Sequence, residues 1–324
     1  MSNLDYTFAV ARIRALESKL LNEAVMDQIL LCETEQDAIS VLLEKGWGNG
    51  METNVSTEEL LQTETTKTWE IMRQLNVDAS VFEILFYPHL FHNLKAAIKE
   101  VCTEEHNPHI YYEDTSISSE EMVKMVKNHN FSQLSYQMAK VAEEAYETLL
   151  HTRDGQLCDL IVDRGCMESI LEGGKKAKEQ MLQDYGELVV ALTNIKIAIR
   201  CARVAKPIDF VQKALVKCSS LSVEELARAA VNGEDAVRNY LLTTGYSDSV
   251  EALEQSFSAF ECWSDNRLID FIQDQKYVSF SVGPLLAYVI ARESEIKTVG
   301  MILSGIANGL SKESIKGRIR RTYV

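Results

Sequence analysis

The hydrophobic and polar positions of the chain follow a helical period, and one such pattern occurs three times. It surrounds three lysines, Lys95, Lys196 and Lys297, which are 101 residues apart in both intervals. Apolar residues occur seven before, at, and three, four and seven after the residue that precedes each lysine, so we expect a helix with one buried stripe in each copy. The stripes consist of Tyr87, Leu94, Ala97, Ile98 and Val101, then Leu188, Ile195, Ala198, Ile199 and Ala202, then Val289, Ile296, Val299, Gly300 and Leu303.

Three copies at this spacing account for nearly all of the 324 residues. Self-similarity at a fixed period indicates an architecture assembled from one repeated unit, and we predict units at residues 1–106, 107–206 and 207–324. We expect the repeated helices to end at Asn107-Pro108, at Lys206-Pro207 and at Gly305. Proline disfavours helical geometry in the preceding residue, and glycine is a common C-terminal cap.

The rest of the chain is also typical of helices. It has only four prolines and is rich in residues that lose little freedom in a helix, so we predict an all-α fold. Three helix starts are predicted by a capping box with a hydrophobic staple, and the boxes begin at Ser56, Ser118 and Ser222. A weaker repeat supports the triplication: residues 37–47 resemble residues 235–246 when one residue is inserted.

Composition and charge exclude several classes of partner. The net charge of −15 would repel phosphate backbones, so we expect no nucleic-acid partner. The longest apolar stretch, residues 282–291, is half the length that a bilayer requires, and the N-terminus lacks a secretory signal pattern. Seven cysteines, an odd number without a Cys-x-x-Cys pair, indicate buried thiols in a reducing cytoplasm rather than disulfides or a zinc site.

A catalytic constellation is absent from the sequence pattern. The two glycine-rich motifs that bind phosphate groups, Gly-x-x-x-x-Gly-Lys-Ser/Thr and Gly-x-Gly-x-x-Gly, do not occur in the sequence. We therefore expect no catalytic, cofactor-binding or metal-ligating residue and no small-molecule substrate. Isolated pairs that could bind a metal are more simply interpreted as helix-surface residues, because no set of four ligands is visible. These pairs are His89 and His92, Glu147 and His151, His106 and His109, and Asp270 and Asp274.

Two groups of cations allow two interpretations each. Lys95, Lys196 and Lys297 either extend a packed stem and a solvated head beside each stripe, or together line a central feature that grips a partner. The C-terminal stretch has a cluster of basic residues with one glutamate. It either complements a helix dipole or contacts a partner. The basic residues are Lys312, Lys316, Arg318, Arg320 and Arg321.

Three segments, residues 6–21, 284–297 and 308–324, resemble the C subunit of the bacterial and archaeal V-type (A-type) ATPases, which is the counterpart of the d subunit of vacuolar proton pumps. The resemblance covers the whole chain. It implies three helical bundles in a funnel around a pseudo-threefold axis, with no enzymatic activity. One departure is Gly300, where the family commonly has arginine, which weakens any expectation of a polar contact at that position.

The resemblance also implies a role. Such proteins are peripheral, lie at the cytoplasmic face of the membrane, bind the proteolipid ring, and receive the foot of the central stalk, built from subunits D and F. The candidate interface residues are Lys95, Lys196, Lys297, Arg318, Arg320 and Arg321. Two alternatives stay open at this point: an α-helical scaffold unconnected to an ATPase, and a helical isoprenoid-type or di-metal enzyme with carboxylates in a buried pocket.

Overall fold

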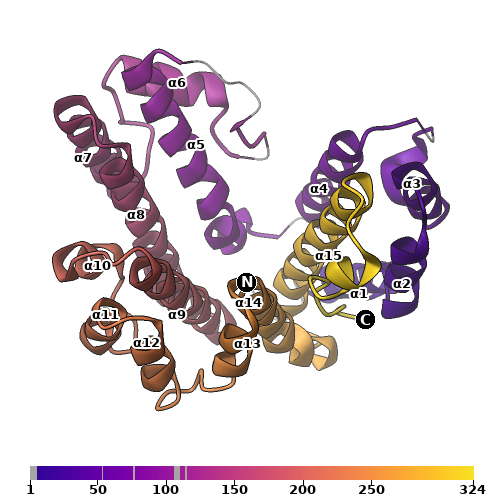
Figure 1. The fold of residues 1–324 in the computed structure, drawn as a ribbon. Coiled ribbons are helices and arrows are strands. Elements are labelled where there is room, and N and C mark those ends of the chain that lie inside the picture. Colours follow the sequence, from indigo (N-terminus) through magenta and orange to yellow (C-terminus); the bar gives the residue numbers. More distant parts are fainter. Residues whose placement is uncertain (1–5, 53, 76, 106–109, 114) are drawn as a thin grey trace. The chain divides into compact units, whose positions relative to one another are not determined.

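The structure is a computed structural model that describes residues 6–324 except 53, 76, 106–109 and 114. The described residues form helices and no strand, which confirms the all-α prediction. They divide into two compact units, one of residues up to 79 together with 249–324, the other of residues 80–248 (Figure 1). The first unit therefore joins the two ends of the chain, while the division into three repeat units stays a prediction.

The first unit is arranged around the long helix α15 (Gly283–Ala307), which packs beside α4 (Thr57–Gln74) (Figure 1). Its core includes Ile29, Leu42, Leu60 and Val299 from four different helices. The other elements of this unit are α1 (Thr7–Glu17), α2 (Glu23–Leu31), α3 (Glu35–Glu44), η1 (Trp47–Gly50), α13 (Ser249–Gln255), α14 (Phe257–Ile272), η4 (Gln273–Tyr277) and α16 (Lys312–Lys316).

The second unit contains the long helices α5 (Glu83–Thr103), α8 (Gly155–Lys176) and α9 (Gln180–Arg203). Helix α8 packs against both α5 and α9 (Figure 1). A Cβ atom on Gly174 would lie 2.8 Å from the carbonyl oxygen of Leu182, so this glycine permits the close turn between α8 and α9. The shorter elements are η2 (Ala79–Phe82), α6 (Ser119–Lys127), α7 (Tyr136–Thr152), α10 (Ile208–Ala214), α11 (Val223–Val231) and α12 (Glu234–Leu241).

The repeated stripes on α5 and α9 are buried as the hydrophobic period predicts, and their central residues are almost inaccessible to solvent. On α15 the prediction is met in part: Val299 and Leu303 are fully buried, whereas Ile296 and Gly300 are only partly buried. The first half of α15 differs from the prediction, because consecutive residues from Leu285 to Ala291 are all buried rather than only one face. That half is packed on every side, as expected where a helix lies in the centre of its unit.

Most predicted helix boundaries are confirmed. Helices α4, α6 and α11 begin directly after Ser56, Ser118 and Ser222, and each serine hydroxyl accepts a hydrogen bond from the backbone N–H three residues later. Helix α9 ends at Arg203, before Lys206-Pro207. The end predicted at Asn107-Pro108 lies outside the described residues, although α5 itself ends at Thr103.

The boundary predicted at Gly305 is wrong. This glycine lies inside α15, where a Cβ atom would be 2.7 Å from a side-chain carbon of Ile315. The left-handed residue after the helix is Gly309, with φ of 65°. Gly305 therefore serves the packing of the C-terminal segment, and Gly309 provides the turn.

Two further expectations concern membrane-spanning helices and the cysteines. No helix in the described part of the chain combines the length and the apolar character needed to cross a membrane. All seven cysteines are free thiols, although only Cys158 and Cys201 are fully buried and the others are partly buried. Burial raises the pKa of the Cys158 thiol to about 11 and that of Cys166 to about 12, which keeps both protonated at neutral pH.

Backbone clamps, a buried ionic network and the candidate interface

The three repeated helices carry a buried polar residue at the same position, two residues before the lysine. On α5 it is Asn93, whose amide donates to the carbonyl oxygen of Tyr112 at 2.8 Å and accepts from the Tyr112 N–H at 2.9 Å. On α9 it is Asn194, which makes the same pair of bonds to Val216 at 2.7 and 3.0 Å. Both asparagines are fully buried, and each fixes the chain that leads to the next helix.

In the third copy the equivalent residue is Glu295 on α15. Its Oε2 accepts a hydrogen bond of 2.5 Å from the backbone N–H of Leu21, just before α2. Leu21 thus precedes Glu295 by 274 residues, whereas Tyr112 and Val216 follow the asparagines that hold them. In the third copy the clamped backbone therefore belongs to the N-terminal segment, whereas in the other two copies it belongs to residues downstream of the clamping helix.

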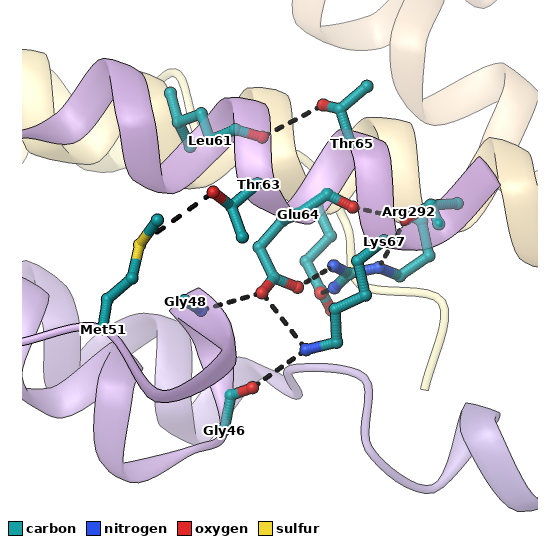
Figure 2. A network of polar contacts seen from close by, with 11 residues as sticks. Gly46, Gly48, Met51, Leu61, Thr63, Glu64, Thr65, Lys67 and Arg292 are labelled. Carbon is teal, nitrogen blue, oxygen red and sulfur yellow. Dashed lines mark hydrogen bonds and ion pairs between the residues drawn. The ribbon is translucent and has the colours of Figure 1, made fainter. Parts of the chain in front are cut away.

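Glu295 belongs to a network of buried charges in the first unit, of which Figure 2 labels Glu64 and Arg292. The Arg292 guanidinium pairs with the carboxylates of Glu64 and Glu295, and all three side chains are at least nine-tenths buried. The Arg292 guanidinium also lies 5.2 Å from the ring centre of Trp47. Arg292 is therefore a cation that bridges two buried carboxylates from different helices.

Glu64 holds the turn that follows α3. Its Oε1 accepts the backbone N–H of Gly48 at 2.9 Å and pairs with the Lys67 ammonium at 3.2 Å (Figure 2). Lys67 also donates to the carbonyl oxygen of Gly46 at 3.0 Å. Gly46 and Gly48 have φ of 86° and 72°, values that favour glycine, so the network fixes a turn that the sequence itself makes possible.

Burial dominates the electrostatics of Glu295. Removal from water raises its pKa to about 7, although the Arg292 cation and the Leu21 N–H both favour the charged form. A buried carboxylate with such a pKa is also what an acid–base enzyme would require. Here its oxygens are used by Arg292 and Leu21, so the group has a structural partner on each side.

The candidate lysines are engaged within the chain. Lys95 pairs with Asp163 of α8 at 2.7 Å, and Lys297 pairs with Asp265 of α14 at 2.6 Å. Lys196 is partly buried on α9 and also interacts with other groups of the chain. Each of the three lysines thus has an intramolecular interaction beside its stripe.

The three C-terminal arginines differ in burial and in their ion pairs. Arg320 is 7% exposed, and its guanidinium binds the Asp265 carboxylate, which Lys297 also contacts. Arg321 is exposed and pairs with Asp270 at 2.9 Å. Arg318 is exposed, and within the described residues its side chain makes no ion pair. Of the three candidate arginines, Arg320 therefore has an internal structural role.

Among the described residues, no group of potential metal ligands contains both members of an isolated pair noted in the sequence. His89 stacks on the Tyr112 ring at 3.9 Å, and His92 lies 2.8 Å from the carbonyl oxygen of Ile110. Asp270 and Asp274 lie on an exposed face of the chain. The pair His106 and His109 lies outside the described residues. Among the described residues, one group places its ligand atoms within 4.8 Å of one another, and all its members are exposed: His129, Glu143 and Glu147.

Long helices, three of which carry a buried polar clamp two residues before the repeated lysine, define an all-helical protein. Residues 9–318 match the family described as ATP synthase (C/AC39) subunit, and the chain belongs to this family. The chain is 25% identical over 331 residues to the C subunit of the V-type sodium ATPase of Enterococcus hirae, covering 96% of this chain and 97% of the relative. It is 22% identical over 338 residues to the C subunit of the A-type ATP synthase of a Desulfurococcus species, covering 96% and 89%. The resemblance found in three segments is thereby confirmed over nearly the whole chain.

Proposed function

We propose that this protein is the non-catalytic C subunit of a V-type or A-type ATPase and acts as a rotor adaptor. It would couple the central stalk, subunits D and F, to the membrane proteolipid ring, so that torque from ATP hydrolysis drives ion transport, or the reverse. The observation that carries the proposal is the family match over residues 9–318, together with relatives that bear the C-subunit name and align along their length. In this role the protein is peripheral, at the cytoplasmic face of the membrane.

The construction of the two units suits an adaptor that transmits torque. Each unit is a set of closely packed helices. Within each unit, buried polar clamps fix segments that connect these helices. Fixed connections between packed helices resist twisting better than flexible linkers do. We further propose that the three bundles implied by the family surround a pseudo-threefold axis as a funnel that receives the stalk.

The candidate interface is part of the same proposal. We expect Lys95, Lys196 and Lys297 to face a common partner, because they occupy equivalent positions of the repeat. The aspartates that bind Lys95 and Lys297 would orient the ammonium groups without removing them from solvent. Of the three candidate arginines, Arg318 and Arg321 are exposed for a contact with the ring.

The proposal predicts that the purified chain binds two different partners separately. In pull-down experiments with an isolated proteolipid ring in detergent and with a purified D–F stalk pair, both should be retained by the immobilised chain. A chain that retained neither would refute the adaptor role, and an α-helical scaffold unconnected to an ATPase would give that result.

In the same pull-down experiments, variants of the C-terminal segment test whether its arginines contact the ring. Replacing Arg318 and Arg321 together by alanine should weaken ring binding at low salt and leave stalk binding intact, because exposed charges act over about a Debye length. Arg320→Ala is a poor probe of the contact, since it removes a buried ion pair. Unchanged ring affinity in the double variant would refute the contact through this segment.

A further inference from the structure

The clamp on α15 differs chemically from the two clamps on α5 and α9. Asn93 and Asn194 each both donate to and accept from the backbone that they hold, and an amide does not titrate near neutral pH. Glu295 holds the Leu21 N–H through a carboxylate. The same position of the repeat therefore contains a group that can gain a proton.

The segment that Glu295 holds leads into the helix pair α2–α3, which resembles the pair α11–α12 of the second unit. Helices α2 and α3 follow Leu21, and α11 and α12 follow Val216; both first helices have nine residues. The weak sequence repeat places residues 37–47 against residues 235–246, which lie in and after α3 and α12. The pair α2–α3 thus completes the arrangement around α15, although it lies at the other end of the chain.

We propose that Glu295 makes a pH-dependent contact that holds the α2–α3 pair against α15, and that this pair opens more readily as the pH rises through neutrality. The closed form contains the Leu21–Glu295 bond, with Glu295 only 7% exposed. In the open form this carboxylate would lie in water. The inference concerns the fold of the first unit and does not rest on the proposed function.

The direction follows from the two environments of the carboxyl group. Burial raises the pKa of Glu295 to about 7 in the closed form, against 4.5 for a solvated glutamate. Between these values the closed form binds a proton that the open form does not bind, so a lower pH favours closure. The protonated group still accepts the Leu21 N–H through its carbonyl oxygen, and Arg292 keeps its pair with Glu64.

Other charged and titratable groups lie near Glu295. A small cavity next to it is lined by Leu20, Leu21, Arg320, Arg321 and Tyr323, among others. Glu17 of α1 lies 3.3 Å from the Tyr323 hydroxyl. The charged and titratable groups near Glu295 are Glu64 on α4, Tyr288 and Arg292 on α15, and Arg320, Arg321 and Tyr323 around the cavity.

Hydrogen exchange of two backbone amides in the full chain tests the proposal. The Leu21 N–H is bound to Glu295, and the Val216 N–H is bound to Asn194 in the equivalent clamp. After correction for intrinsic exchange, protection of the Leu21 amide should fall roughly 20-fold from about pH 5.5 to about pH 8. Protection of the Val216 amide should stay constant over the same range.

Reciprocal variants distinguish the titration of Glu295 from a general effect of pH on amide protection. Glu295→Gln keeps an acceptor for Leu21 without a titrating proton and should abolish the pH dependence at Leu21. Asn194→Asp introduces a carboxyl group into the other clamp, and protection at Val216 should then fall as the pH rises. Wild-type protection at Leu21 that is independent of pH, or an unchanged pH dependence in Glu295→Gln, would overturn the proposal. If Glu295→Gln does not fold, the wild-type comparison and Asn194→Asp still decide it.

Discussion

Replacing Arg292 by alanine should lower the free energy of unfolding of the first unit by about 3–5 kcal/mol. The substitution leaves Glu64 and Glu295 buried on different helices with no guanidinium between them. Lys67 can neutralise part of the charge on Glu64, but it lies 35% exposed at the edge of the network. The cost is large because an unpaired buried carboxylate must either lose its solvation or take up a proton.

Chemical denaturation followed by circular dichroism measures this effect. The matched control is Arg203→Ala, which removes an exposed pair with Glu234 and should cost less than about 1 kcal/mol. The double variant of Arg292→Ala with Glu64→Gln should be less destabilised than the two single losses combined, since it removes one of the stranded charges. Equal losses for Arg292→Ala and Arg203→Ala would contradict the importance of the network.

Replacing Asn194 by leucine should destabilise the second unit by roughly 2–4 kcal/mol. The leucine side chain is similar in size, but it leaves both the N–H and the carbonyl oxygen of Val216 without their partner. Val216 is only 4% exposed, so water reaches these groups poorly. Two unsatisfied backbone groups then bear the cost of desolvation.

The same denaturation experiment measures this prediction. Asn232→Leu is the matched control, because Asn232 is exposed and its amide bonds the Arg228 carbonyl oxygen of its own helix. We expect a change within about 0.5 kcal/mol there. A loss at Asn194 no greater than at Asn232 would mean that the clamp does not stabilise the unit.

Much of the fold could be predicted from the sequence because the signals are local. The stripe around Ile195 and the cap at Ser118 depend on residues within two helical turns, and both are found where the pattern predicts them. The prediction at Gly305 failed because that glycine is required for packing against Ile315, which is a tertiary contact. A glycine near a helix end does not by itself distinguish these two uses.

The polar centres were missed because their partners are distant in the sequence. Asn93 and Asn194 occupy matching positions of the repeat, and this recurrence within an apolar stripe was a signal that could have indicated a common structural role. Arg292 and Glu64 are 228 residues apart, and no sequence pattern relates them. For the same reason, the charges alone could not show that Arg320 is buried against Asp265 while Arg318 is exposed.

The most direct measurement of the adaptor role compares ATP hydrolysis with ion transport in membranes that contain or lack this chain. The account predicts that without it the catalytic part still hydrolyses ATP, ATP-driven ion transport is lost, and adding the purified chain restores transport. Transport that persists in its absence would contradict the proposed coupling between stalk and ring.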